Sequence, residues 1–167
     1  TCPVSVIPIC IAPPNICINP SQTNSISQTA NLCNGTYFVP YGLSITVNNI
    51  KVSCNNTILK GNISNYPTAF FAYDKTNISI ENCRLVDYNT GFGFQNVNNS
   101  YFINNTMTNG SYGFDIYYGN KNSFIKNRFN NVYTSFWLYR SSNNSFLNNS
   151  VLGGTTGFLM YENNTKN

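Results

Sequence analysis

The chain has 167 residues, of which only 8% are charged; its formal net charge is +4, and it contains no histidine. Its nine Lys and Arg residues are scattered, whereas a nucleic-acid-binding protein would gather them into a basic stripe. No apolar run approaches the roughly 20 residues that a membrane-spanning helix needs. The length indicates one main domain, and the composition predicts neither a nucleic-acid partner nor a membrane span.

Residues 1–33 differ from the rest, and we expect them to form an extension rich in proline and cysteine that acts as a donor strand or a cap. Pro8 has no amide hydrogen to donate, so the apolar segment around it is expected to be an edge strand or a strand added to another sheet. Residues 22–31 are polar and are expected to form a loop. The apolar segment contributes five β-branched residues, Val4, Val6, Ile7, Ile9 and Ile11.

The main domain is expected over residues 34–167, with its first recognisable repeat at 50–61. Residues 62–68 interrupt the pattern and contain Pro67, which favours a protruding turn. From Ala69 onward, residues of one kind recur with a constant period of 22. The columns with this period are Phe70, Phe92, Phe114, Phe136 and Phe158; Ile80, Phe102, Phe124 and Phe146; Leu85, Met107, Phe129 and Val151; and Asn105, Asn127 and Asn149, with Cys83 at the equivalent place.

A fixed period in this range is typical of a solenoid, in which each repeat buries its apolar face against its neighbours. Apolar residues alternate within each repeat, as in Phe92-x-Phe94, and this alternation predicts strands. No window has the spacing and the capping residues of a helix. We therefore expect a parallel β-coil in which the phenylalanines stack inside and the repeated asparagines hydrogen-bond from coil to coil.

Residues 97–107 and 142–151 resemble the right-handed parallel β-helix repeat of pectate-lyase-like and NosD-like proteins, and residues 50–58 are similar to the repeat that opens such domains. The resemblance covers residues 35–167. It implies an all-β, right-handed, single-stranded parallel β-helix with about 22 residues per coil. It implies little about function, because this fold carries lyases, hydrolases, epimerases, adhesins and inert stalks.

Six cysteines form an even set in which no two are separated by the two residues typical of a metal-binding pair. Disulfides in an oxidising compartment are therefore predicted, and six cysteines allow 15 pairings. We expect Cys54 to pair with Cys83, because they fall at nearly equivalent places in successive repeats, and the four N-terminal cysteines to pair among themselves. These four are Cys2, Cys10, Cys17 and Cys33.

Ten asparagines begin Asn-x-Ser/Thr sequences, a mild excess over the roughly six that so Asn-rich a chain would contain by chance. The chain begins with Thr, which suggests that a signal peptide has been removed. Together with the cysteines, these features predict a secreted glycoprotein of the cell surface. The candidate glycosylation sites are Asn34, Asn55, Asn62, Asn77, Asn98, Asn104, Asn109, Asn143, Asn148 and Asn163.

If the phenylalanines point inward, the residues that alternate with them point outward and form an exposed apolar strip. Such a strip marks a binding surface, and two uses remain open: its rings stack on sugars, or they form a dry contact between subunits. A third reading swaps the inner and outer faces. The strip consists of Phe71, Asp115, Trp137 and Leu159, flanked by Tyr73, Tyr117, Tyr139 and Tyr161; a second outward column holds Ile103, Ile125 and Leu147.

Hydrolysis in this fold would need carboxylates about 5–10 Å apart on one face. Of the five carboxylates, only Asp74 and Glu162 share a column, and they lie about 19 Å apart at about 4.8 Å per coil. The others, Glu81, Asp87 and Asp115, occupy different columns. The sequence therefore predicts no enzyme, no catalytic residue, no metal site and no cofactor.

The last repeat stops about halfway round its coil without a capping helix, and an open parallel edge can pair with another chain. Our leading hypothesis is a secreted structural protein that assembles head-to-tail into a filament or surface layer. In this hypothesis the apolar segment 4–11 adds to the open coil of a neighbouring copy. The alternative is a carbohydrate-binding or adhesin module that uses the Tyr/Trp strip. The expected partners are other copies of the chain, covalent N-glycans and, in the alternative, a polysaccharide.

Overall fold

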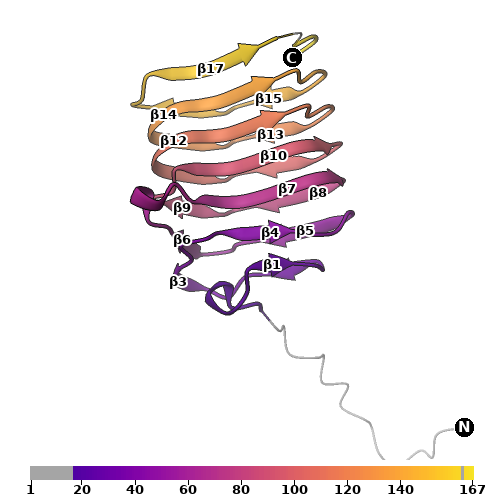
Figure 1. Ribbon diagram of the computed structural model, residues 1–167. Helices are drawn as coiled ribbons and strands as arrows, with labels where there is room; N and C mark the ends of the chain where they lie inside the picture. Colours follow the sequence, from indigo (N-terminus) through magenta and orange to yellow (C-terminus); the bar gives the residue numbers. More distant parts are fainter. Residues whose placement is uncertain (1–16, 163) are drawn as a thin grey trace, which may run out of the picture.

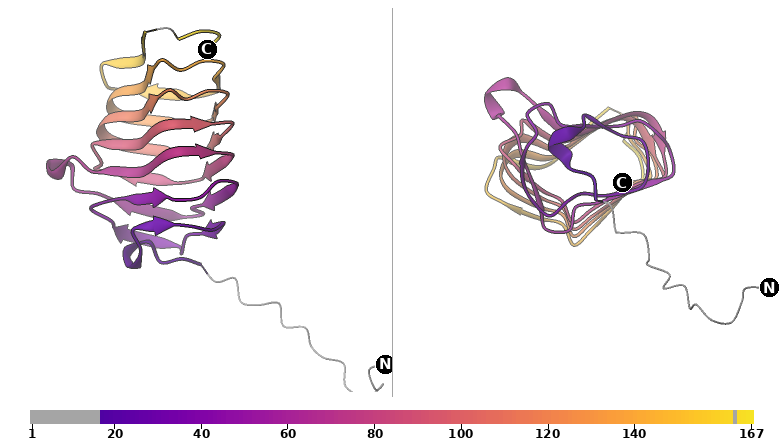
Figure 2. Two further views of the ribbon diagram at one scale, coloured as in Figure 1. Left: turned by 45° about the vertical axis from the view of Figure 1, so that its right-hand side comes forward. Right: turned by 90° about the horizontal axis from the view of Figure 1, so that it is seen from below.

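The structure is a computed structural model that describes residues 17–162 and 164–167. It is an all-β parallel solenoid of about 6 turns with about 22 residues per coil, as the repeat predicts. Figure 1 shows the coils stacked one above another, from β1 (Ser25–Ile26) near one end to β17 (Thr156–Tyr161) at the other. In the axial view of Figure 2, successive coils overlap in one elongated outline.

The strands belong to two parallel sheets. In the larger sheet the order is β1, β4 (Leu43–Ile45), β7 (Thr68–Thr76), β10 (Thr90–Asn98), β12 (Thr106–Tyr117), β9 (Arg84–Val86), β6 (Thr57–Lys60) and β3 (Gly35–Phe38), while β14 (Arg128–Tyr139) pairs with β12, with β16 (Ser150–Leu152) and with β17. In the smaller sheet the order is β15 (Ser145–Leu147), β13 (Ser123–Ile125), β11 (Tyr101–Ile103), β8 (Ile78–Glu81), β5 (Ile50–Ser53) and β2 (Ala30–Asn31). Two short 3-10 helices, η1 (Pro20–Gln22) and η2 (Ile63–Asn65), complete the elements of the described residues.

The predicted phenylalanine columns form the core. Phe70, Phe92, Phe114, Phe136 and Phe158 are partners in successive strands, and all but Phe158 are buried. The rings of Phe92 and Phe114 stack with their centroids 4.4 Å apart. Each such ring removed from water contributes about 1.5–3 kcal/mol, so the repeat of 22 residues stabilises the fold at every coil.

The repeated asparagines form the expected ladder. The side-chain Nδ2 of Asn105 donates to Oδ1 of Asn127 at 3.1 Å, and Nδ2 of Asn127 donates to Oδ1 of Asn149 at 3.1 Å. Cys83 holds the same place one coil earlier, where its backbone N donates to Oδ1 of Asn105. A second ladder was not predicted from the sequence, although the period of 22 is visible from Ser100 through Asn122 to Asn144; this ladder ends 23 residues later at Asn167.

The coils turn at residues in the left-handed region, and this explains much of the asparagine content. More than half of the non-glycine residues with positive φ are asparagines, such as Asn104 (φ 53°) and Asn148 (φ 54°). Asparagine tolerates this conformation better than most residues, because its short polar side chain bonds locally. The same corners hold five of the ten glycosylation candidates. The preference for asparagine at these corners therefore explains part of the number of Asn-x-Ser/Thr sequences.

The solenoid begins earlier than expected. Residues 22–31 are not only a loop, because they contain β1, which pairs with β4, and β2, which pairs with β5. Ile18 bridges to Leu32, so the winding already includes residues assigned to the extension before residue 34. The spacing there is irregular (Ser25 pairs with Ser44), and this irregularity hid the first coil from a search for a period of 22. Cys2, Cys10 and the apolar segment 4–11 lie outside the described residues.

Two local expectations agree with the structure. Residues 62–68 project from the side of the solenoid, as both views of Figure 2 show, and contain η2 and the exposed Tyr66. Cys54 and Cys83 form a disulfide across adjacent coils, with their Cα atoms 4.7 Å apart. Cys17 is bonded to Cys33, which is one of the pairings open to the N-terminal cysteines.

Candidate ligand-binding site

The outer face of the larger sheet carries the strip that the sequence analysis singled out. Strand pairing aligns two columns across β7, β10, β12, β14 and β17. The strip residues therefore share one face. The phenylalanine column that alternates with them is buried apart from Phe158, so the alternative reading with the inner and outer faces exchanged is wrong. The first column is Phe71, Gly93, Asp115, Trp137 and Leu159, and the second is Tyr73, Gln95, Tyr117, Tyr139 and Tyr161.

Gly93 opens a hollow of about 190 Å³ in this face. Phe71 and Tyr73 from β7 lie on one side of it, and Asp115 and Tyr117 from β12 lie on the other. A Cβ atom at Gly93 would lie 3.0 Å from Cγ2 of Thr68, so a side chain here would enter the space. Gly93 was not predicted as a site residue, although a glycine in a column of large side chains is a visible signal in the sequence.

Asp115 is the carboxylate of this hollow. It is half-buried, its Oδ1 atom is enclosed, and that atom has no hydrogen-bond partner among the described residues. Burial raises the pKa of Asp115 to about 6, because removal from water disfavours the charged form. The described residues place no Lys or Arg nitrogen within 4.0 Å of it; their ion pairs are Lys51–Glu81, Lys60–Asp87 and Arg140–Glu162.

Aromatic residues neighbour Asp115 on its own strand and on β14. The ring of Tyr112 packs on that of Trp137 with centroids 5.0 Å apart, and Trp137 Nε1 is buried with no partner among the described residues. The pKa of Tyr117 is raised by burial and by the nearby charge of Asp115. An unpaired carboxylate and an unpaired indole N–H beside exposed rings are uncommon in a surface that only faces water.

The tyrosine column is continuous toward β17. The rings of Tyr117 and Tyr139 lie 5.5 Å apart, and those of Tyr139 and Tyr161 lie 6.1 Å apart. Tyr139 Oη donates to Glu162 at 2.9 Å, and Arg140 forms an ion pair with the same carboxylate at 2.7 Å. These hydrogen bonds lower the pKa of Glu162 and hold Tyr139 in place. The column is therefore partly fixed before any ligand arrives.

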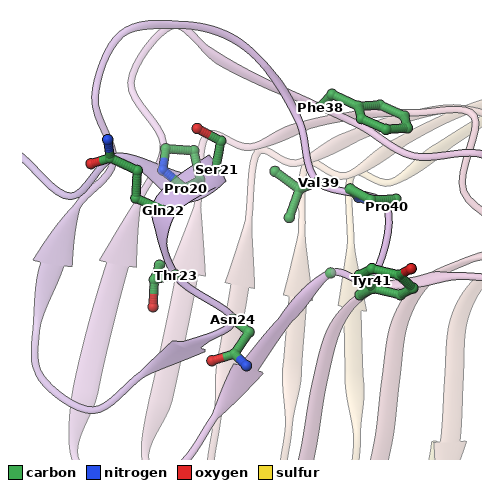
Figure 3. Close-up of a pocket in the computed structure, with 10 residues that line it drawn as sticks. Pro20, Ser21, Gln22, Thr23, Asn24, Phe38, Val39, Pro40 and Tyr41 are labelled. Atoms are coloured by element: carbon green, nitrogen blue, oxygen red, sulfur yellow. The ribbon is translucent and has the colours of Figure 1, made fainter.

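A larger hollow, of about 480 Å³, lies at the N-terminal end of the described residues. Figure 3 shows residues 20–24 on one side of it and Phe38, Val39, Pro40 and Tyr41 on the other. None of these lining side chains is charged at neutral pH. The residues that precede Cys17 adjoin this end in sequence and lie outside the described part. The hollow at Gly93, which combines a carboxylate with rings, is therefore the better candidate.

The remaining predicted sites are dispersed. Of the nine described glycosylation candidates, seven are exposed and two, Asn98 and Asn109, are half-buried; Asn163 is not described.

Asp74 and Glu162 do share one corner column, at opposite ends of the regular coils. Asp74 Oδ1 accepts a hydrogen bond from Asn96 at 2.8 Å. No group of three or more described Cys, Asp or Glu residues could hold a metal ion.

The comparisons with known proteins agree with this architecture. A sequence model of the family described as "Right handed beta helix region" matches residues 41–167, which is most of the chain. This chain belongs to the right-handed β-helix family. Searches of curated proteins and of solved structures found no significant match. The β-helix family contains both enzymes and proteins without enzyme activity, so membership leaves the activity of this β-helix open.

Neither of the short helices in the part of this β-helix that the structure describes is long and apolar enough to cross a membrane.

Proposed function

We propose that the outer face of the larger sheet binds carbohydrate. The observation that carries this proposal is the in-register column of tyrosine rings, of which Tyr73, Tyr117 and Tyr161 are exposed. The C–H faces of sugar rings pack on aromatic rings, while sugar hydroxyls need polar partners. Gln95, Asp115 and the tyrosine hydroxyls lie on the same face and supply such partners.

We propose binding without turnover. Asp115 is the one acidic residue among the side chains of the two outer columns between β7 and β14. Glycoside hydrolysis uses two carboxyl groups about 5–10 Å apart, one as acid and the other as base or nucleophile. A single carboxylate can orient a hydroxyl but cannot fill both roles.

A glycan array followed by affinity electrophoresis tests the proposal. The wild-type chain should be retained by at least one polysaccharide, and Tyr117→Ala combined with Tyr139→Ala should remove the retention. The matched control is Tyr133→Ala, because Tyr133 is an exposed tyrosine of β14 that lies outside both columns. The proposal would be overturned if the wild-type chain bound no glycan on the array, or if the double variant were retained as strongly as the wild type.

A second candidate function is end-to-end assembly as a structural subunit. In the last described coil, Phe158 is 46% exposed and Met160 is 44% exposed, although their columns are buried in the preceding coils. Another coil added in register would cover both side chains, whether it came from a longer chain or from another copy. The apolar segment 4–11, our expected donor strand, is outside the described residues and stays a prediction.

Light scattering and negative-stain microscopy test assembly. If copies stack, the wild-type chain should form filaments or concentration-dependent oligomers, and Phe158→Lys combined with Met160→Lys should leave monomers. Tyr66→Lys, in the projecting turn, is the control. Monomers of the wild-type chain at every concentration would exclude this candidate.

The proposed setting is extracellular, with N-glycans on the coil corners. Two disulfides and exposed sequon asparagines such as Asn104 support it. Intact-mass measurement of the native protein before and after enzymatic removal of N-glycans tests it. An unchanged mass would remove the glycans from the proposal.

A further inference from the structure

We propose that the hollow at Gly93 binds an alkylammonium group, such as the trimethylammonium head of a choline-type ligand. This site lies on the proposed carbohydrate-binding face but does not depend on carbohydrate binding.

The shape of the hollow suits a small cation. Gly93 is the member of its column without a side chain, and it lies between Phe71 on β7 and Asp115 on β12. Those outer strands are about 9.6 Å apart, which is two inter-strand spacings. A cation seated above Gly93 would therefore lie about 5 Å from each strand. Aromatic side chains from both strands line the space that such a cation would fill, and aromatic rings attract cations that lie within roughly 6 Å of their centroids.

The residues that line the hollow also favour positive charge. Three aromatic side chains, Phe71, Tyr73 and Tyr117, line the hollow together with one carboxylate, Asp115. Ring faces and a carboxylate both attract positive charge, and no described Lys or Arg forms an ion pair with Asp115. Burying a carboxylate is costly unless an opposite charge compensates it. A bound cation would supply that charge, which no described Lys or Arg supplies to Asp115. An anionic ligand would meet repulsion from the same group.

The hollow is small. The volume of about 190 Å³ is below the roughly 300–1,000 Å³ of pockets that enclose whole ligands. The hollow therefore fits a head group, with the rest of the ligand lying on the surrounding face. Gln95, which lies between Tyr73 and Tyr117, leaves that side of the hollow polar and open to water.

Calorimetric titration with choline tests the proposal. The neutral isostere, in which a tert-butyl group replaces the trimethylammonium, has the same shape without the charge. We expect the wild-type chain to bind choline and to bind the isostere at least about tenfold more weakly, because the cation–π and ion-pair attraction is lost. Asp115→Asn should weaken choline binding by at least about tenfold, because the amide keeps a hydrogen-bond acceptor but not the charge.

Two further variants make the result specific. Asp87→Asn, which neutralises a carboxylate at a coil corner outside the hollow, should leave choline binding unchanged. Gly93→Val should fill the space and abolish binding, with circular dichroism as the check on its folding. The proposal is overturned if the wild-type chain does not bind choline, if the isostere binds equally well, or if Asp115→Asn binds choline as the wild type does. Glycan retention that survives in Asp115→Asn would leave the carbohydrate proposal standing.

Discussion

The Oδ1 atom of Asn127 accepts two hydrogen bonds from Asn105, one from the backbone N at 3.0 Å and one from the side-chain Nδ2 at 3.1 Å. Both asparagines are buried between coils. The Nδ2 atom of Asn127 also donates to the backbone carbonyl of Phe102 at 2.8 Å. One side chain thus satisfies two backbone groups of the preceding coil, the carbonyl of Phe102 in β11 and the N–H of Asn105 in the turn that follows β11.

Asn127→Ala should lower the free energy of unfolding by about 3 kcal/mol. The substitution leaves the buried backbone N of Asn105 and the carbonyl of Phe102 without partners, and each unsatisfied buried group costs about 1–3 kcal/mol. Urea denaturation followed by circular dichroism measures the change. Asn130→Ala, at an exposed position of β14, should stay within about 0.5 kcal/mol of the wild type. Equal midpoints for the two variants would contradict this account of the ladder.

Phe114→Ala should lower the free energy of unfolding by about 3–5 kcal/mol, because it leaves a cavity in a filled column. The Phe114 ring stacks on Phe92 on one side and on Phe136, 5.4 Å away, on the other. Phe158→Ala in the same column should cost less, about 1–2 kcal/mol, because that ring is 46% exposed. Thermal unfolding of the two variants compares them directly, and a larger loss for Phe158→Ala would contradict the column model.

Replacing both members of the Cys54–Cys83 disulfide with alanine should lower the free energy of unfolding by about 3 kcal/mol. The two residues are separated by 29 positions, and opening a loop of this size releases conformational entropy in the unfolded chain. Guanidinium denaturation of the double variant without reductant measures the effect while Cys17–Cys33 stays oxidised. A midpoint equal to that of the wild type would indicate that neighbouring coils hold residues 54 and 83 together without the bond.

Asp115→Asn should stabilise the fold near pH 7 and have little effect at pH 4. The pKa of Asp115 rises from its ordinary 3.8 to about 6 on folding, so the folded state binds the proton more tightly. The contribution of the protonated Asp115 carboxyl to stability is therefore complete below pH 3.8, and it is lost as the pH rises through about 6. The gain from the amide at pH 7 should be about 1 kcal/mol, because solvent screens a half-exposed carboxyl. Melting curves of both proteins at pH 4 and pH 7 decide this, and a destabilised variant at pH 7 would contradict it.

The sequence predicted the coil because residues that recur with a constant period along the chain occupy equivalent positions in successive coils. Phe92 and Phe114 are 22 residues apart, and that spacing made them neighbours in adjacent strands. Cys54 and Cys83 were matched by the same reasoning, since equivalent positions in successive coils lie close together. The first coil was missed because its residues, such as Ser25 and its partner Ser44, do not keep the period.

The amino-acid sequence by itself determined the winding, the inward columns and the outward placement of the tyrosines, because each depends only on period and alternation. Only the tertiary structure decided the site. The hollow exists because Gly93 separates Phe71 from Asp115, which are 44 residues apart in the chain. Burial raises the pKa of Asp115, and the neighbours of Asp115 in its own column, Gly93 and Trp137, differ from one coil to the next.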